Sequence, residues 1–122
     1  MKRVLIVDDM RSLRAFYRVL LKDTDYLLDE AGDGATAIKK CLGTTPPDLV
    51  FLDIMMPGMS GIETCQHIKE RRKDIAVVIV SNKKDRFNMQ QARQAGCDGF
   101  LGKPVNRDEL VKTIDNLLYE AA

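Results

Sequence analysis

The chain of 122 residues contains a single histidine and only three cysteines. The cysteines are widely separated, odd in number and without the spacing of metal ligands, which argues against a disulfide framework. Long hydrophobic runs are also absent. The first apolar stretch, residues 4–7, stops at two aspartates and is too short for a signal-peptide core or a membrane span. We therefore expect a cytoplasmic protein, and we assign no role to His67, which lies among polar residues.

The sequence has no excess of charge of either sign. Its 19 Lys and Arg residues oppose 18 Asp and Glu residues, so the net charge of +1 gives no broad electrostatic case for binding nucleic acid or membranes. Hydrophobic residues make up 45% and charged residues 30%, as in ordinary soluble globular proteins. Internal repeats, linkers and low-complexity segments are lacking. We expect one domain over residues 1–122.

Short unbroken apolar runs recur along the chain, at residues 4–7, 49–52 and 76–80. Runs of this kind are typical of central parallel strands that helices cover on both faces. Two weaker runs, at residues 26–28 and 99–101, fill the remaining strand positions, and their shortness suits the edges of a sheet. The sequence therefore predicts five strands.

Helical periodicity appears between these runs. Apolar residues line one helix face in the first and last of these segments: Leu13, Phe16, Tyr17, Leu20 and Leu21, and then Leu110, Ile114, Leu117, Leu118 and Ala121. Capping residues predict further helix starts at Asp33, Ser60 and Asn106. The segment 85–95 is only weakly amphipathic, so we expect a loosely packed helix there. Five strand–helix pairs predict an α/β fold, a doubly wound five-stranded parallel sheet.

Polar residues stand at the ends of four predicted strands. Asp8 and Asp9 follow the first strand, Asp53 follows the third, Ser81 the fourth and Lys103 the fifth. The carboxyl ends of parallel strands meet at one edge of the sheet, which is where α/β proteins bind ligands. We therefore expect these five residues to converge.

The three aspartates predict a cation site. Two carboxylates about 5 Å apart repel each other by about 3 kcal/mol at an effective dielectric constant near 20. A hard cation such as Mg²⁺ relieves this repulsion and keeps a coordination position for a phosphate oxygen, whereas the looped ligands typical of a Ca²⁺ site are missing. Lys103 and Ser81 can contact phosphoryl oxygens, and Asp53, which precedes a turn-rich loop, is placed to act as a nucleophile.

These motifs resemble the receiver domains of two-component response regulators. They comprise Val-Asp-Asp at 7–9, Leu-Asp-Ile-Met-Met-Pro-Gly-Met-Ser-Gly at 52–61, Ser81, and Lys103-Pro104. The resemblance spans the whole chain and implies a flavodoxin-like (βα)5 fold with strand order 2-1-3-4-5. Pro104 permits a cis bond after Lys103, and the sequence leaves the isomer open.

The resemblance implies a phosphorylation-dependent signalling switch. It gives each motif residue a role: Asp53 as phosphoacceptor, Asp8 and Asp9 with Asp53 and the main-chain carbonyl of Met55 as Mg²⁺ ligands, and Ser81 and Lys103 as phosphoryl contacts. The phosphoryl group would come from a phosphohistidine on a sensor histidine kinase or a histidine phosphotransfer protein. The domain would assist its own phosphorylation and slow dephosphorylation without being an enzyme in the ordinary sense.

The resemblance also implies a conformational response. In the family, the hydroxyl residue moves toward the phosphoryl group, and an aromatic residue three positions before the lysine turns inward. Ser81 and Phe100 occupy these positions. Phe100 lacks the hydroxyl of the tyrosine that many relatives carry, and Asn82 is bulkier than the alanine or glycine that commonly follows the hydroxyl residue. We expect phosphorylation-dependent binding of a downstream protein through the face built from residues 85–120.

Other functions fit parts of the sequence. A phosphatase of the haloacid-dehalogenase type needs a second aspartate where Met55 stands, and a flavodoxin-like electron carrier needs a glycine-rich phosphate loop where Asp8 and Asp9 would repel phosphate. Two alternatives stay open. The chain could be a pseudo-receiver interaction module that phosphorylation does not regulate, or one domain of a longer regulator.

Overall fold

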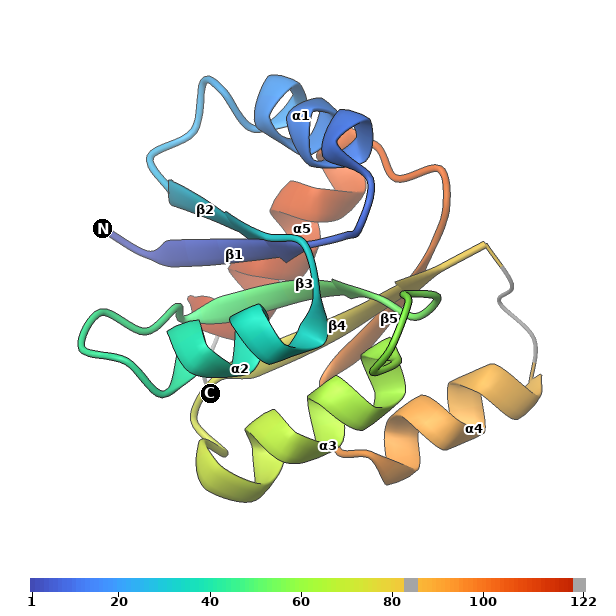
Figure 1. The fold of residues 1–122 in the computed structure, drawn as a ribbon. Coiled ribbons are helices and arrows are strands. Elements are labelled where there is room, and N and C mark those ends of the chain that lie inside the picture. The colour runs from blue at the N-terminus through green and yellow to red at the C-terminus, as the bar shows by residue number, and fades with distance from the viewer. Residues whose placement is uncertain (83–85, 120–122) are drawn as a thin grey trace.

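Strands and helices alternate along the chain, and all paired strands run parallel (Figure 1). The structure is a computed structural model and describes residues 1–82 and 86–119. Within these residues the elements are β1 Arg3–Val7, α1 Arg11–Leu20, β2 Leu27–Ala31, α2 Gly34–Cys41, β3 Leu49–Asp53, α3 Gly61–Arg71, β4 Ala76–Ser81, α4 Arg86–Gln94, β5 Gly99–Gly102 and α5 Arg107–Leu118.

The five strands form one sheet in the order β2-β1-β3-β4-β5, which confirms the predicted topology. The two weak apolar runs form the edge strands β2 and β5, as their shortness predicted. The register places Val7 beside Leu52, and Asp53 beside Val80. The central strands therefore end almost level, so that residues just beyond them share one edge of the sheet.

Two hydrophobic clusters fill the space between the sheet and its helices. Figure 1 shows α1 and α5 on one face of the sheet, and α2, α3 and α4 on the other. Side chains of each strand alternate between the two clusters: Val4 and Ile6 pack toward α1 and α5, whereas Leu5 and Val7 pack toward the opposite helices. Burial on both faces explains why the central strands read as unbroken apolar runs.

The predicted helix caps are present. The side chains of Asp33, Ser60 and Asn106 accept hydrogen bonds from main-chain N–H groups three residues later, at the starts of α2, α3 and α5. All three cysteines are free thiols, which agrees with the predicted absence of disulfides. None of the helices in residues 1–82 and 86–119 combines the length and apolar character that crossing a membrane requires.

Some predicted boundaries are wrong. The second strand covers Leu27–Ala31 and not residues 26–28, because an edge strand tolerates charged residues such as Asp29 and Glu30, which pair with cations of neighbouring helices. Phe16, predicted to be on the buried face of α1, is 41% exposed. Asp85 and Ala121, each part of a predicted helix, lie outside the described residues.

The start of α3 lies directly against the end of β3. The Gly61 N–H donates to the carbonyl oxygen of Ile54 at 3.0 Å. A Cβ atom at position 61 would overlap the carbonyl oxygen of Asp53 and lie 2.8 Å from the Cα atom of Ile54. Both neighbours are backbone atoms of the candidate site, so neither can move aside as a side chain could.

We predict that Gly61→Ala lowers the free energy of unfolding by about 1–3 kcal/mol or more, because the methyl group must push α3 away from β3. Urea melts measure this change. The matched control is Gly32→Ala, where the nearest atom to an added Cβ is 3.5 Å away and belongs to a side chain. The control should stay within about 0.5 kcal/mol of the wild type. Equal losses in the two variants would contradict the close contact.

Candidate functional site

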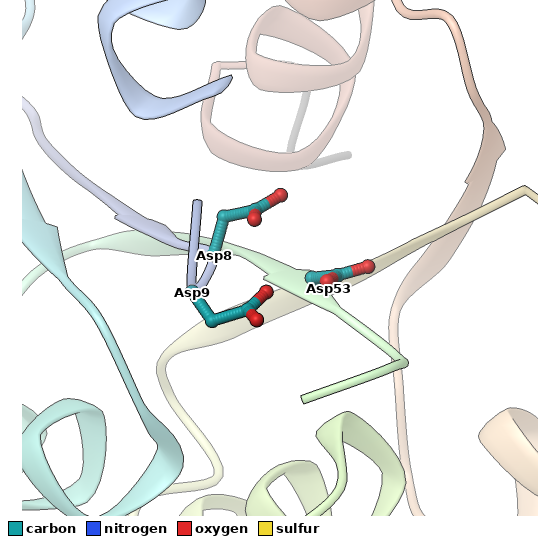
Figure 2. A group of neighbouring side chains, drawn as sticks. All are labelled: Asp8, Asp9 and Asp53. Atoms are coloured by element: carbon teal, nitrogen blue, oxygen red, sulfur yellow. The ribbon is translucent and has the colours of Figure 1, made fainter. Parts of the chain in front are cut away.

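The three aspartates of the predicted cation site lie together at the sheet edge (Figure 2). Asp8 and Asp9 follow β1, and Asp53 is the last residue of β3. One carboxylate oxygen of each residue lies within 4.8 Å of those of the others. Asp8 and Asp53 are buried, whereas Asp9 is exposed, so one side of the cluster is open to solvent.

Lys103 bridges two of these carboxylates. Its Nζ atom lies 3.1 Å from Asp53 Oδ1 and 3.3 Å from Asp8 Oδ2, and its side chain is only 15% exposed. The residue follows β5 and is held in place by its main-chain N–H, which donates to the carbonyl oxygen of Ser81 at 2.9 Å. The Lys103–Pro104 peptide bond, left open by the sequence, is cis. Asp8 and Lys103, which are 95 positions apart in the sequence, thus form an ion pair.

The other predicted site residues occupy the same edge. Ser81 is buried at the end of β4, one residue beyond the partner of Asp53 in the sheet register. Met55 follows Asp53 by two residues, and its side chain is 75% exposed. Phe100 lies in β5, partly buried against the hydrophobic cluster on the side of α2, α3 and α4. The structure therefore brings Asp8, Asp9, Asp53 and Lys103 together, with Ser81 on the strand next to β3. Phe100 lies in β5, three residues before Lys103.

Among the residues that the structure describes, the site gathers three carboxylates and one amine, and therefore more negative than positive charge. Burial raises the pKa of Asp53, and the nearby charge of Asp8 adds to this rise, so that Lys103 offsets it only in part. Burial also opposes the charge of Lys103, but the hydrogen bond and the charge of Asp53 outweigh burial and raise the pKa of the amine. The amine therefore stays protonated, and the surplus charge lies on the carboxylates.

This donor set fits a hard divalent cation. Three carboxylates offer only oxygen ligands, which Mg²⁺ prefers, and one amine cannot neutralise them. The carboxylate oxygens are close enough together to share one ion, and the exposed side of the cluster at Asp9 leaves room for water or a phosphate oxygen. The residues present thus match the predicted Mg²⁺ site.

A cavity of about 310 Å³ adjoins Lys103, between the start of α1 and the segment that follows β5. Asn82 and Tyr17 also line it. The Tyr17 ring stacks on Phe51 with the ring centroids 5.9 Å apart. Burial, together with the charges of Asp8 and Asp53, raises the pKa of the Tyr17 phenol far above its usual range, so the phenol stays neutral. The apolar periodicity of α1 predicted only a core position for Tyr17.

Arg14 was not among the predicted site residues, and its Nη1 atom donates to the carbonyl oxygen of Asp8 at 2.7 Å. The signal was an arginine beside the apolar stripe of α1, in the first turn of the helix that follows Asp8 and Asp9. Arginines at such positions are common on exposed helix faces, so the pattern alone could not distinguish this one.

We predict that Asp53→Asn raises the free energy of unfolding of the metal-free protein at neutral pH. The folded-state pKa of Asp53 is raised above its ordinary value of 3.8, so ionisation above the folded-state pKa destabilises the fold, and a neutral amide avoids this loss. The gain should vanish below pH 3.8, where the carboxyl group is protonated in both states. Urea melts across this range test it, with the exposed Asp25→Asn as control. A less stable Asp53→Asn variant at neutral pH would contradict the raised pKa.

Comparison with known proteins identifies the family. The model of the response regulator receiver domain matches residues 4–115. The chain is 37% identical to the transcriptional regulatory protein ResD of Bacillus subtilis over 120 residues, 98% of this chain but 49% of ResD. It is 34% identical to protein PilG of Pseudomonas aeruginosa, over 92% of this chain and 84% of PilG. It is 32% identical to the chemotaxis protein CheY of Halobacterium salinarum, over 96% of this chain and 97% of CheY.

Solved structures agree with the sequence relatives. The chemotaxis protein CheY4 of Vibrio cholerae superposes with a TM-score of 0.89 at 29% identity, covering 97% of this chain and 99% of CheY4. The response regulator TrrA of Thermotoga maritima, solved in complex with Mg²⁺-BeF, gives a TM-score of 0.85 at 34% identity and covers 97% of this chain and 100% of TrrA. The chain spans about half the length of ResD and of several other relatives. It belongs to the receiver domain family of two-component response regulators, which gives it a role in signalling.

Proposed function

We propose that this domain is switched by phosphorylation of Asp53, with a phosphohistidine on a sensor histidine kinase or histidine phosphotransfer protein as the donor. One observation carries the proposal: the amine of Lys103 lies between Asp53 and Asp8, in a cluster of three carboxylates. Such a cluster is adapted to a cation and a phosphoryl group together. One amine cannot balance three carboxylates, and this imbalance favours a functional site over an ion pair that serves only stability.

In the proposed reaction, a carboxylate oxygen of Asp53 attacks phosphorus as the bond from phosphorus to the histidine nitrogen breaks. The electron pair of that bond returns to the imidazole ring. The ring leaves as neutral imidazole when its other nitrogen already carries a proton, and otherwise it takes a proton from water. Lys103 already touches the attacking carboxylate, so its charge is in place when negative charge spreads over the phosphoryl oxygens. Ser81, at the end of the neighbouring strand, would donate a hydrogen bond to another oxygen.

Asp8, Asp9, Asp53 and the main-chain carbonyl of Met55 would hold Mg²⁺, which neutralises carboxylate and phosphoryl charge when bound. The Mg²⁺ complex of the relative TrrA supports this choice of cation. The same residues would serve hydrolysis of the aspartyl phosphate. The protein would therefore assist its own phosphorylation and dephosphorylation without turning over a separate substrate.

The proposed output is a change in the face formed by α4, β5 and α5. Within the described residues of α4 only Ala92 is fully buried, and Phe87 is 68% exposed, so little packing opposes movement of this helix. Ser81 and Phe100 would act as the switch residues that connect Asp53 to this face. A downstream protein would read the change by binding; direct contact with nucleic acid or membrane is not part of the proposal. We also propose that the domain spans residues 1–122 and works in the cytoplasm.

We predict that a small phosphodonor with Mg²⁺ adds one phosphoryl group to the wild-type chain and none to Asp53→Asn, because the amide cannot act as a nucleophile. Intact-protein mass spectrometry measures the addition, and Asp25→Asn, which removes an exposed carboxylate away from the site, should label as the wild type does. Undiminished labelling of Asp53→Asn would refute the assigned acceptor. A wild type that remains unlabelled would instead favour the pseudo-receiver.

We predict that Asp9→Asn weakens Mg²⁺ binding while stabilising the metal-free fold. The substitution removes a cation ligand and, at the same time, relieves carboxylate repulsion within the cluster. Thermal melts recorded over a Mg²⁺ titration show both effects, as a higher starting melting temperature and a smaller rise on adding metal. Parallel titration curves for the variant and the wild type would exclude Asp9 as a ligand.

A further inference from the structure

An arginine on α1 forms a hydrogen bond with the backbone between Asp8 and Asp9. Arg14 Nη1 donates to the main-chain oxygen of Asp8 at 2.7 Å, and its Nε donates to Glu30 Oε1 at 2.8 Å. The Arg14 side chain is 16% exposed. One guanidinium therefore ties α1 to the end of β1 and to the edge strand β2.

The contact fixes the peptide that joins the two predicted metal ligands. The carbonyl group of Asp8 and the N–H of Asp9 belong to one planar unit, so a bond to this carbonyl sets the direction in which the chain enters Asp9. On its other side, the Asp8 N–H donates to the carbonyl oxygen of Ala31 at 3.2 Å, and Asp8 Oδ1 accepts the N–H of Met10 at 2.9 Å. Asp9 itself is exposed, so the aim of its carboxylate depends on this backbone.

Glu30 reduces the repulsion expected between an arginine and a nearby cation. Its carboxylate pairs with Arg14 through one oxygen and with Arg18 through the other. The hydrogen bonds from Arg18 and then Arg14 lower the pKa of Glu30, which therefore stays ionised and offsets one of the two guanidinium charges. With its charge partly offset, Arg14 contributes chiefly geometry. The planar fork of donors can hold a carboxylate and a carbonyl oxygen at once, which a lysine amine cannot do with the same direction.

We propose that Arg14 is a positioning residue of the metal site, which orients the Asp8–Asp9 peptide so that both carboxylates face Asp53, and that Glu30 holds the guanidinium in that orientation. The inference rests on the proposed function, in which these carboxylates bind Mg²⁺. It adds a residue from α1, and through Glu30 one from β2, to a site otherwise built from the ends of β1, β3 and β5.

The sign of the effect on Mg²⁺ affinity tests the proposal. Isothermal titration of the whole chain with MgCl₂ should show the dissociation constant rising about tenfold or more in Arg14→Gln, as for other residues that orient metal ligands. Arg14→Lys, which keeps the charge but loses the fork, should also bind more weakly than the wild type. If Arg14 acted only through its charge, Arg14→Gln would bind Mg²⁺ more tightly and Arg14→Lys would match the wild type. That pattern would overturn the proposal.

Arg18→Gln is the matched control. It removes the same charge from the same helix and the same partner, Glu30, but the described bonds of Arg18 go to Glu30 and to the carbonyl oxygen of Leu28 and not to Asp8. Its Mg²⁺ affinity should equal or slightly exceed that of the wild type. A loss equal to that of Arg14→Gln would assign the effect to Glu30 or to the helix and overturn the proposal.

A metal-free measurement separates this inference from the proposed function. The Met10 amide donates to Asp8 Oδ1, so its hydrogen exchange reports on the segment that contains Asp8 and Asp9. Exchange should be faster in Arg14→Gln and unchanged in Arg18→Gln, because only the first variant loosens this segment. A wild type that binds no Mg²⁺ would defeat the proposed function, yet this exchange rate would still show whether Arg14 holds the segment. Unchanged exchange in Arg14→Gln would overturn the positioning role.

Discussion

The pairing of one amine with two buried carboxylates is the interaction on which the site depends. Lys103 follows β5, Asp8 follows β1, and Asp53 is the last residue of β3. Three segments that are distant in the sequence therefore meet at a single positive charge. This charge makes burial of the two carboxylates tolerable, but the exposed Asp9 brings a third carboxylate close to them. The folded domain therefore holds electrostatic repulsion that an added cation would relieve. The proposed affinity for a metal would in this sense be a consequence of how the sheet edge is assembled.

The backbone around Asp53 is held firmly on one side of the site and more loosely on the other. Toward α3, the Gly61 N–H donates to the carbonyl oxygen of Ile54, and Gly61 packs directly on the end of β3. Toward α4, a helix with one fully buried residue covers the sheet. A change at Asp53 meets little resistance in the direction of α4. The asymmetry agrees with a rigid acceptor and a responsive face, which is the division of labour that a phosphorylation switch needs.

The family resemblance predicted the sheet order, and the residues themselves predicted the helix caps and the meeting of the three aspartates with Lys103, because apolar runs specify where strands end. Prediction failed where tertiary contacts decide. The sequence did not predict that β2 includes Asp29 and Glu30. Their charges are accommodated by ion pairs with Lys40 and with two arginines of α1, which only the folded structure shows. Arg14 reads as a surface residue for the same reason: its function lies in a bond to a carbonyl group six residues away, and no side-chain pattern encodes the direction of a carbonyl.

The pairing of β4 with β5 indicates how the absence of one hydroxyl would affect the proposed switch. Ser81 pairs with Gly102, and the Lys103 N–H bonds to the carbonyl oxygen of Ser81, so a shift of Ser81 is passed to β5 directly. Phe100, two residues before Gly102, has no hydroxyl that could form a hydrogen bond in either position of its ring. Its contribution must come from burial. Complete burial of an exposed phenylalanine stabilises by about 1.5–3 kcal/mol, and Phe100 is already partly buried, so further burial would contribute only part of this amount. In the proposed switch, this packing energy would couple the aromatic residue to the state of Asp53.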